Sequence, residues 1–205
     1  ITLYNYEQLI RRCILSAAQQ DMEALEIIVV DDRSTDDSVG VAGSLIESLE
    51  VPAMLIRKSL NTGVAHSRNI GIMNARGRFV FTLDADNYLA TSCIRKLYHG
   101  LRTKKAAAGY CTIQQIDDQG ASLGQVSNRA YKLRKLLNGT FYIDAMAMFD
   151  RLVLLDLGMY STELLRHGIG WEDYELWLRL GLAGHQVIHL NEELALYHVH
   201  EHSML

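Results

Sequence analysis

The chain has 205 residues, 49% of them hydrophobic, and a formal net charge of −4, which together predict one domain with a substantial core. The scattered Lys and Arg side chains argue against a nucleic-acid-binding surface, which needs a clustered basic footprint. Three Cys residues without a C-x-x-C spacing indicate neither a disulfide framework nor a zinc site, and no apolar run reaches the about 18 residues of a membrane span.

The chain opens at Ile1, without Met, in what we interpret as the end of a first strand whose beginning is missing. We therefore expect a fragment of a longer protein. Its cysteine usage favours a reduced compartment, and no signal peptide is visible, so we expect it in the cytoplasm. Any attachment to the cytoplasmic face of a membrane would come from other parts of the full-length protein.

Two predicted strands end in acidic residues, and we call each such place an acidic strand end. The first follows a helix predicted over residues 7–20. Residues 26–30 are an apolar strand that runs directly into Asp31 and Asp32, and a helix-start signal follows them. A helix up to about residue 49 and a strand over 51–56 come next. In an open α/β sheet, ligands bind at the carboxyl ends of the strands, so these two carboxylates are candidate ligand contacts.

The second acidic strand end follows a helix predicted over residues 64–75. The strand of residues 78–83 stops at Asp84, and Asp86 comes two positions later. In an extended chain these two side chains point the same way and could hold one hard divalent cation, although Asp is also a common turn residue. The two acidic strand ends together describe a cleft suited to a nucleotide sugar, with a carboxylate for the base or ribose and a metal for the diphosphate.

Beyond the second acidic end we predict a helix over residues 92–101, a strand over 106–113 and a hairpin tip at 117–120. The two aspartates of that tip are ordinary turn residues, and we assign them no role. The basic residues Lys132, Arg134 and Lys135 have the pattern of a solvated helix face. An apolar segment over 141–149 is interrupted by Asp144, and residues 158–170 have few core positions, which favours a mobile loop.

Glu172 and Asp173 stand in the first turn of the last predicted helix, where the helix dipole favours an ionised carboxylate. Acidic residues are common in first turns for that reason alone. Near the end of the chain His198, His200 and His202 alternate, and in an extended strand they would share one face and could form a transition-metal site by themselves.

Five motifs recur in the order typical of one known family, and together they cover nearly the whole chain. They are Val30-Asp31-Asp32-x-Ser34-Thr35-Asp36, Asn61-x-Gly63-x-Ala65-x-x-Arg68-Asn69-x-Gly71, Leu83-Asp84-Ala85-Asp86-Asn87, Trp171-Glu172-Asp173-x-Glu175-Leu176-Trp177 and Tyr197-x-x-His200-x-x-Ser203. On these motifs the chain resembles the inverting family 2 glycosyltransferases of the GT-A fold.

The resemblance implies a Rossmann-like, three-layer α/β/α sandwich with a mostly parallel mixed central sheet. It implies one domain over residues 1–205, with a nucleotide-sugar-binding half up to about residue 125 and an acceptor-side half over about 126–205. The implied reaction transfers a sugar from a nucleotide-diphosphate sugar to an acceptor hydroxyl. The sequence leaves open the donor sugar, the base and the acceptor, which could be a carbohydrate, a lipid-linked molecule or a protein.

The resemblance also implies the donor contacts. Tyr4 would lie against the nucleotide base, and Asp31 and Asp32 would bind base and ribose. Asp84 would contact either the ribose or the metal. Arg68 could reach the diphosphate or one of the carboxylates, and an ordinary structural ion pair is the alternative reading.

For the metal, the resemblance singles out Asp86 as the surest ligand of Mn²⁺ or Mg²⁺ and His200 as a contact to the metal or diphosphate. Asp173 would be the general base, and Glu172 would position the acceptor or support the base. The sequence departs from the family pattern at Asp150, where a basic residue is common, and at His198, where Arg is common. Phosphate contacts at these two positions are therefore not carried over.

Two other functions remain open. A sugar-phosphate nucleotidyltransferase would need a Gly-rich phosphate loop near the N-terminus, which this sequence lacks. A non-catalytic nucleotide- or sugar-binding module would have lost the metal carboxylates or the base. Asp84, Asp86 and Asp173 are all present, so we expect an enzyme.

Overall fold

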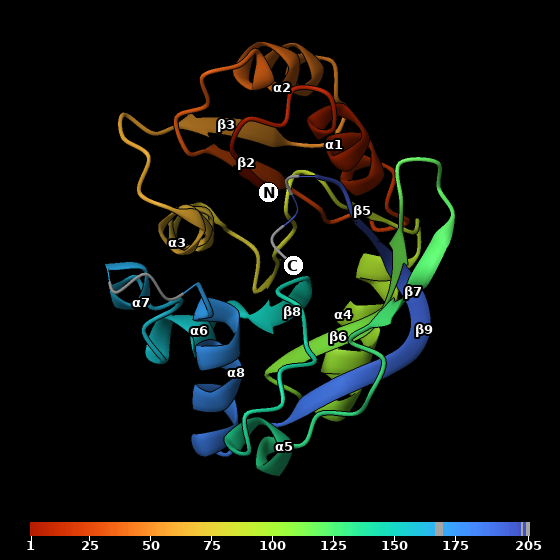
Figure 1. The fold of residues 1–205 in the computed structure, drawn as a ribbon, viewed down its shortest axis with the longest axis vertical. Coiled ribbons are helices and arrows are strands. Elements are labelled where there is room, and N and C mark those ends of the chain that lie inside the picture. The colour runs from red at the N-terminus through yellow and green to blue at the C-terminus, as the bar shows by residue number, and fades with distance from the viewer. Residues whose placement is uncertain (167–169, 202, 204–205) are drawn as a thin grey trace.

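The computed structural model describes residues 1–166, 170–201 and 203. Its first sheet is parallel throughout, with the order β1-β2-β3. These strands are β1 (Thr2–Leu3), β2 (Ile27–Asp31) and β3 (Ala53–Arg57). The sheet is flanked by α1 (Ile10–Ala18), α2 (Ser38–Glu47) and α3 (Val64–Asn74), in the upper part of Figure 1.

The second sheet is mixed and lies in the lower part of Figure 1, with the order β4-β8-β6-β9-β5 and with β7 paired to β6. Its strands are β4 (Phe79–Phe81), β5 (Tyr88–Leu89), β6 (Ala108–Ile116), β7 (Ser122–Val126), β8 (Ala147–Asp150) and β9 (Val187–His198). A parallel bridge between Thr2 and Asp84 joins the two sheets. The second acidic strand end therefore lies directly beside β1.

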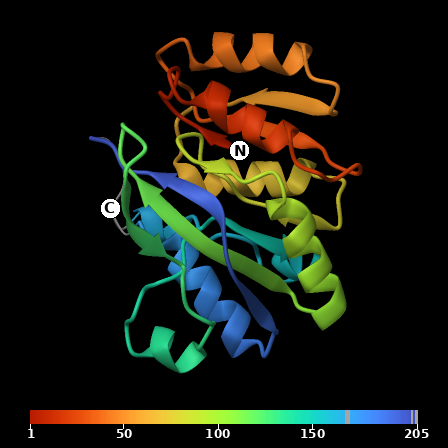
Figure 2. The same cartoon turned by 90° about the vertical axis from the view of Figure 1, so that its right-hand side faces the viewer.

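Helices cover both faces of the second sheet (Figure 2). Along β6, Cys111 and Ile113 pack in one core cluster with residues of α4 (Cys93–Lys104), whereas Tyr110 packs in the other with Trp177 of α8 (Glu172–Leu182). Alternate residues of a strand face opposite sides of its sheet, so β6 is the buried middle of three layers. The remaining short helices are α5 (Leu133–Leu137), α6 (Arg151–Asp156) and α7 (Glu163–Arg166).

The predicted helices and the mixed α/β sandwich are confirmed, and the structure refines the strands. Parallel pairing dominates the first sheet, whereas the second has one parallel pair, β6 with β9. This difference arises because β7 and β8 return as antiparallel neighbours of β6 rather than through crossover helices. The proposed mobile loop of residues 158–170 contains α7, and its residues 167–169 lie outside the described part of the chain, as does His202.

Candidate active site

The first acidic strand end is held by its own loops. Asp31 accepts the backbone N–H of Ser34 at 3.1 Å, which fixes the turn after β2. Asp32 accepts the N–H groups of Thr62 at 2.9 Å and Gly63 at 2.8 Å, at the start of α3. Both carboxylates are buried, so these bonds compensate their desolvation and tie β2 to the loop that carries α3 into place.

Lys58 completes this corner, because its ammonium lies 2.5 Å from Asp32 Oδ1 and 3.0 Å from Ser67 Oγ. Tyr4 directly follows β1, next to this corner, and has 44% of its surface exposed. The next residue, Asn5, has a left-handed backbone with φ of 55°, and its side-chain oxygen accepts the N–H of Thr35 at 2.8 Å. The Tyr4 ring is therefore presented to solvent beside the turn that Asp31 fixes.

The second acidic strand end turns instead of continuing as a strand. The N–H of Asn87 donates to the carbonyl of Asp84 at 3.0 Å, so the extended geometry predicted for residues 84–86 is wrong. The chain turns here because the Asp84 side chain binds residues of β1 and α3. Its carboxylate accepts from Thr2 Oγ1 at 2.6 Å and from Arg68 Nη2 at 3.1 Å.

Asp86 has a different environment from Asp84. Its Oδ2 lies 3.3 Å from His200 Nε2, whereas its Oδ1 is buried without a hydrogen-bond partner among the described residues. Burial, together with the charge of Asp84, raises the pKa of the Asp86 carboxyl. An unsatisfied buried carboxylate oxygen is costly unless an outside group completes it, and a hard divalent cation fits that oxygen-donor chemistry.

Arg68 is the centre of the site. It lies buried in α3 and donates from Nη1 to Glu172 Oε1 at 2.6 Å and from Nη2 to both oxygens of Asp84. The planar guanidinium suits two carboxylates at once, so it joins the end of β4 to the start of α8. Of the contacts predicted for Arg68, those to carboxylates are the ones present. Its Nε has no partner among the residues that the structure describes.

Asp173 follows Glu172 in the first turn of α8. Its carboxylate accepts the N–H of Tyr174 at 2.7 Å. Burial raises the pKa of Asp173 to about 6, against the opposing effect of the Arg68 charge. Burial thus outweighs the charge of Arg68, and the group is poised to accept or release a proton near neutral pH.

Asp144 is a carboxyl that sequence reasoning did not assign to the site. Burial, together with the charges of Asp84 and Asp173, raises its pKa to about 7, so it lies near these two carboxylates. It lies in the loop before β8 and accepts the N–H of Met146 at 2.8 Å. The available signal was an acidic residue inside an otherwise apolar segment.

The two positions that depart from the family pattern have structural partners. Asp150 caps α6 by accepting the N–H of Leu152 at 3.1 Å, and it pairs with Arg78 at 2.8 Å. His198 Nε2 lies 2.9 Å from Asp118 Oδ1, so one aspartate of the hairpin tip has a partner that the sequence did not reveal.

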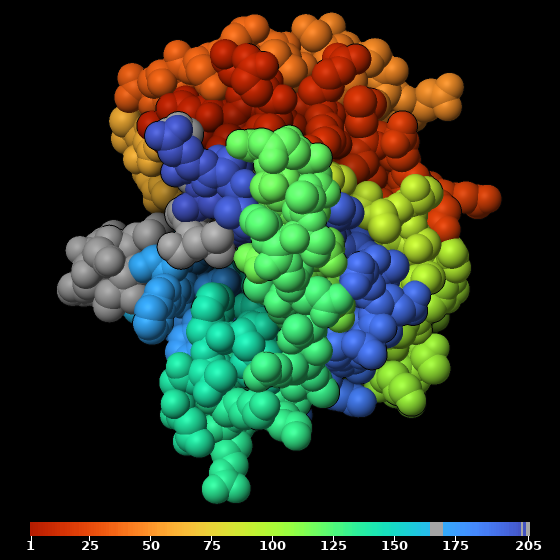
Figure 3. Space-filling view, turned by 45° about the vertical axis from the view of Figure 1, so that its right-hand side comes forward, coloured from red at the N-terminus to blue at the C-terminus, as the bar shows by residue number. Residues whose placement is uncertain are grey.

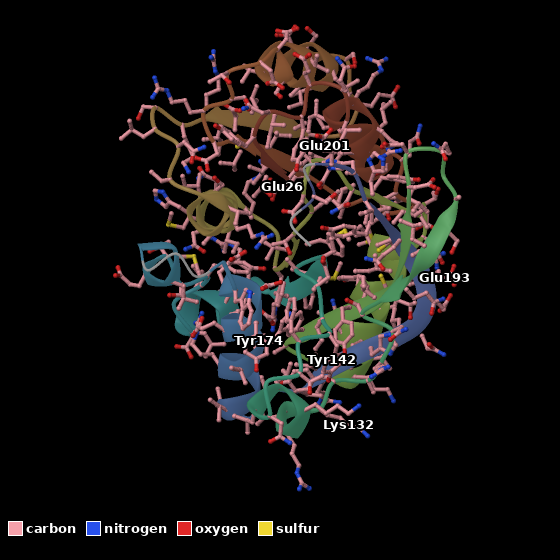
Figure 4. All side chains as sticks on the ribbon, in the orientation of Figure 1. Glu26, Lys132, Tyr142, Tyr174, Glu193 and Glu201 are labelled. Atoms are coloured by element: carbon pink, nitrogen blue, oxygen red, sulfur yellow. The ribbon has the colours of Figure 1, made fainter. Side chains whose placement is uncertain are left out.

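Two further observations delimit the site. Within the described residues, no group of three or more His, Cys, Asp or Glu side chains could hold a metal by itself. A cavity of about 960 Å³ opens between β2 and β4. The carboxylates in its lining are Glu23 and Glu26, and its lining also includes Thr2 and Arg68, which bind Asp84. Figure 4 shows Glu26 beside β2, in the upper part of the molecule.

A comparison of the sequence with known families matches residues 1–158 to the model of glycosyl transferase family 2. The chain belongs to this family. It is 28% identical over 194 residues to a chondroitin synthase of Pasteurella multocida (strain Pm70), covering 94% of this chain and 19% of that protein. It is 27% identical over 213 residues to the Escherichia coli UDP-Glc:alpha-D-GlcNAc-diphosphoundecaprenol beta-1,3-glucosyltransferase WfaP, covering 100% of this chain and 77% of that protein.

The fold is that of solved GT-A glycosyltransferases. Staphylococcus aureus TarS 1–349 in complex with UDP-GlcNAc matches with a TM-score of 0.80 and 20% identity, over 98% of this chain and 58% of that one. The mannosyltransferase PcManGT from Pyrobaculum calidifontis, in complex with GDP-Man and Mn²⁺, matches with a TM-score of 0.76 and 21% identity, over 98% and 56% of the two chains. The chain thus spans little more than half of these structures and about a fifth of the synthase. Its family and its fold are therefore those of GT-A glycosyltransferases.

Proposed function

We propose that this glycosyltransferase inverts the anomeric centre, depends on a divalent metal and uses Asp173 as its general base. The observation that carries the proposal is the Asp173 carboxyl, whose pKa burial raises to about 6, next to Glu172 and within the electrostatic reach of Asp84. A base whose pKa lies near the working pH is ionised and still able to take a proton. Such perturbed carboxyls are typical of catalytic sites.

The donor would be a nucleotide-diphosphate sugar bound at the carboxyl ends of β2 and β4. We propose that Tyr4 contacts the nucleotide base and that Asp31 and Asp32 bind the nucleotide base and the ribose. The oxygens of these carboxylates have lone pairs beyond those that accept the backbone N–H groups of the loops. The complexes of TarS with UDP-GlcNAc and of PcManGT with GDP-Man support this class of donor. Asp84 would contact the ribose or the metal, and Arg68, which binds Asp84, would contact the diphosphate.

The metal would be held by Asp86 and His200, with Asp84 as a further contact. The buried Oδ1 of Asp86, which lacks a partner among the described residues, supports this assignment, and so does Mn²⁺ in the PcManGT complex. When bound, Mn²⁺ or Mg²⁺ neutralises charge on the leaving diphosphate. Magnesium-type sites use one or two carboxylates plus substrate phosphates, so a protein cluster of three ligands is not needed.

In the transfer step, the ionised Asp173 takes the proton from the acceptor hydroxyl as that oxygen bonds to the anomeric carbon. The bond to the diphosphate breaks on the opposite face, which inverts the configuration. Glu172, fixed by Arg68, positions the acceptor or supports the base.

We propose the cytoplasm as the compartment, because Cys13, Cys93 and Cys111 are free.

The test is turnover of UDP- and GDP-sugars in the presence of manganese, measured as released nucleoside diphosphate. Asp173→Asn keeps the side-chain volume but cannot take the proton, so the rate per folded molecule should fall about 10²–10⁴-fold while donor affinity stays nearly unchanged. Glu175→Gln, on the same helix, is the matched control, because Glu175 pairs with Arg179 instead.

A variant with unchanged turnover would contradict the assignment of the base. No turnover of any donor by the wild-type protein, despite nucleotide binding, would instead favour a non-catalytic binding module.

A further inference from the structure

One stretch of the chain has a charge opposite to that of the whole. Residues 121–143 contain no Asp or Glu and four basic residues, in a chain whose formal net charge is −4. The basic residues are Arg129, Lys132, Arg134 and Lys135, which lie in α5 or just before it. Figure 1 shows α5 at the lower end of the molecule, the end opposite α2.

These basic side chains are available to a partner. Arg129, Lys132 and Arg134 are exposed, and Lys135 lies over the Tyr142 ring at 5.9 Å. Within the described residues, none of the four forms a salt bridge. Figure 4 shows Lys132 and Tyr142 together beside α5. Their charges are therefore not neutralised by the protein.

Large apolar side chains are exposed in α5 and in the segments that contact it. Leu137 has 57% of its surface exposed, Phe141 48% and Trp171 60%. The rings of Phe141 and Trp171 both pack edge-on against the Tyr174 ring, with ring centroids 5.7 Å and 6.0 Å apart. The Tyr174 hydroxyl also donates to the carbonyl of Leu136, next to Leu137. The apolar residues thus come from α5, the following loop and the start of α8.

We propose that this face, the α5 surface, docks on an anionic phospholipid bilayer. The α5 surface consists of Arg129, Lys132, Arg134, Lys135, Leu137, Phe141 and Trp171. Lys and Arg near a bilayer are attracted to anionic headgroups, and aromatic and aliphatic side chains enter the interfacial region. In Figure 3 the segment that carries α5 protrudes at the lower end of the molecule, so a flat surface can approach it.

The combination of charge and apolar side chains favours a bilayer over a soluble polyanion. A soluble polyanion would pair with the basic residues but would leave Leu137, Phe141 and Trp171 in water. A bilayer accommodates both kinds of side chain, and exposed apolar groups bordered by charge are typical of such surfaces. No described helix is long and apolar enough to cross a bilayer, so this docking would be peripheral.

The α5 surface adjoins the acceptor side of the proposed active site. Phe141 precedes Asp144 by three residues, which span at most about 10 Å of extended chain. Trp171 precedes Asp173 by two residues, and the Asp173 charge acts on Asp144. Docking would therefore hold the base near the bilayer, where an acceptor hydroxyl carried by a lipid would lie. This orientation rests on the proposed function, whereas the docking itself does not.

The test is co-sedimentation of the purified protein with vesicles, without any donor or acceptor. The protein should bind vesicles of equal parts phosphatidylcholine and phosphatidylglycerol and bind pure phosphatidylcholine only weakly. Its binding to the anionic vesicles should weaken as salt is raised but persist in part through the apolar side chains. The triple variant Lys132→Gln, Arg134→Gln, Lys135→Gln should lower the partition into anionic vesicles about 100-fold, at about one kcal/mol for each cation. Trp171→Ser should weaken binding at high salt, where the apolar contribution dominates.

The matched control is Arg102→Gln, Lys104→Gln, Lys105→Gln, which removes three exposed basic residues at the end of α4. It should bind anionic vesicles nearly as the wild type does, and thermal unfolding should show that both triple variants are folded. If both triple variants lost vesicle binding equally, the net charge of the protein alone would explain the binding, and the proposal would be overturned. Binding to soluble polyphosphate without binding to anionic vesicles would overturn it as well. Because no turnover is measured, a failure here leaves the proposed reaction untouched.

Discussion

The two acidic strand ends look alike in sequence and differ in the structure. At the end of β2, backbone N–H groups and Lys58 satisfy Asp31 and Asp32. After β4, Arg68 captures Asp84, and Asp86 retains a buried oxygen with no partner in the described part of the chain. A carboxylate satisfied by backbone holds loops together, whereas an unsatisfied one requires a partner from outside.

The largest effect should follow from removing that unsatisfied carboxylate. Asp86→Ala should abolish turnover and remove the manganese dependence of nucleotide binding, because the proposed metal loses its main ligand. Calorimetric titration with UDP or GDP, with and without manganese, measures this. If Asp86→Ala still binds the nucleotide more tightly with manganese than without it, the metal site is assigned wrongly.

The pH dependence of turnover tests whether Asp173 is the general base. The base must be ionised, and the pKa of Asp173 is raised to about 6. The turnover rate should therefore fall about tenfold for each pH unit below about 6 and level off above it. A rate profile that stays flat down to the ordinary pKa range of an aspartate would show that Asp173 is not the group taking the proton.

At the second acidic strand end, Arg68 forms a buried ion network with Asp84 and Glu172. Arg68→Met leaves Asp84 and Glu172 unpaired in a buried site and should lower the free energy of unfolding by about 3–5 kcal/mol. Arg76→Met is the matched control, because Arg76 pairs with Glu26 while 77% of its side chain is exposed, and it should cost less than about 1 kcal/mol. Denaturant unfolding measures both, and similar values would refute the central place of Arg68.

The smallest effect is expected at the first end. Asp31→Asn keeps an oxygen that can accept from Ser34 and loses only the charge, so the free energy of unfolding should fall by about 1 kcal/mol. The manganese dependence of nucleotide binding should persist in this variant. Its loss would show that Asp31 and Asp86 belong to one metal site.

Much of the fold could be predicted because its signals are local. The helices carry apolar residues at helical spacing, and β2 is an unbroken apolar run that ends at Asp31. The sequence left open whether the residues after β4 extend or turn, because the outcome depends on Thr2 and Arg68, which approach Asp84 from distant positions in the sequence. The antiparallel pairing of β8 was likewise invisible, since its partners β4 and β6 are set by tertiary contacts.

The site shows the same limit. The motifs identified Asp84, Arg68 and Glu172 individually, but Arg68 and Glu172 lie 104 positions apart, and no spacing rule reveals that they pair. Asp144 was missed because its raised pKa comes from burial and from neighbouring charges, neither of which a sequence displays. The partnership of Asp118 with His198 was hidden for the same reason.

The central claim is a metal-assisted site for a nucleotide-diphosphate sugar, and thermal unfolding of the wild-type protein with nucleoside diphosphates tests it most directly. A ligand that binds only the native state raises the midpoint of unfolding in proportion to its affinity and concentration. We predict that UDP or GDP raises the midpoint, and raises it further when manganese is present. A midpoint that no nucleoside diphosphate changes, with or without manganese, would contradict the account.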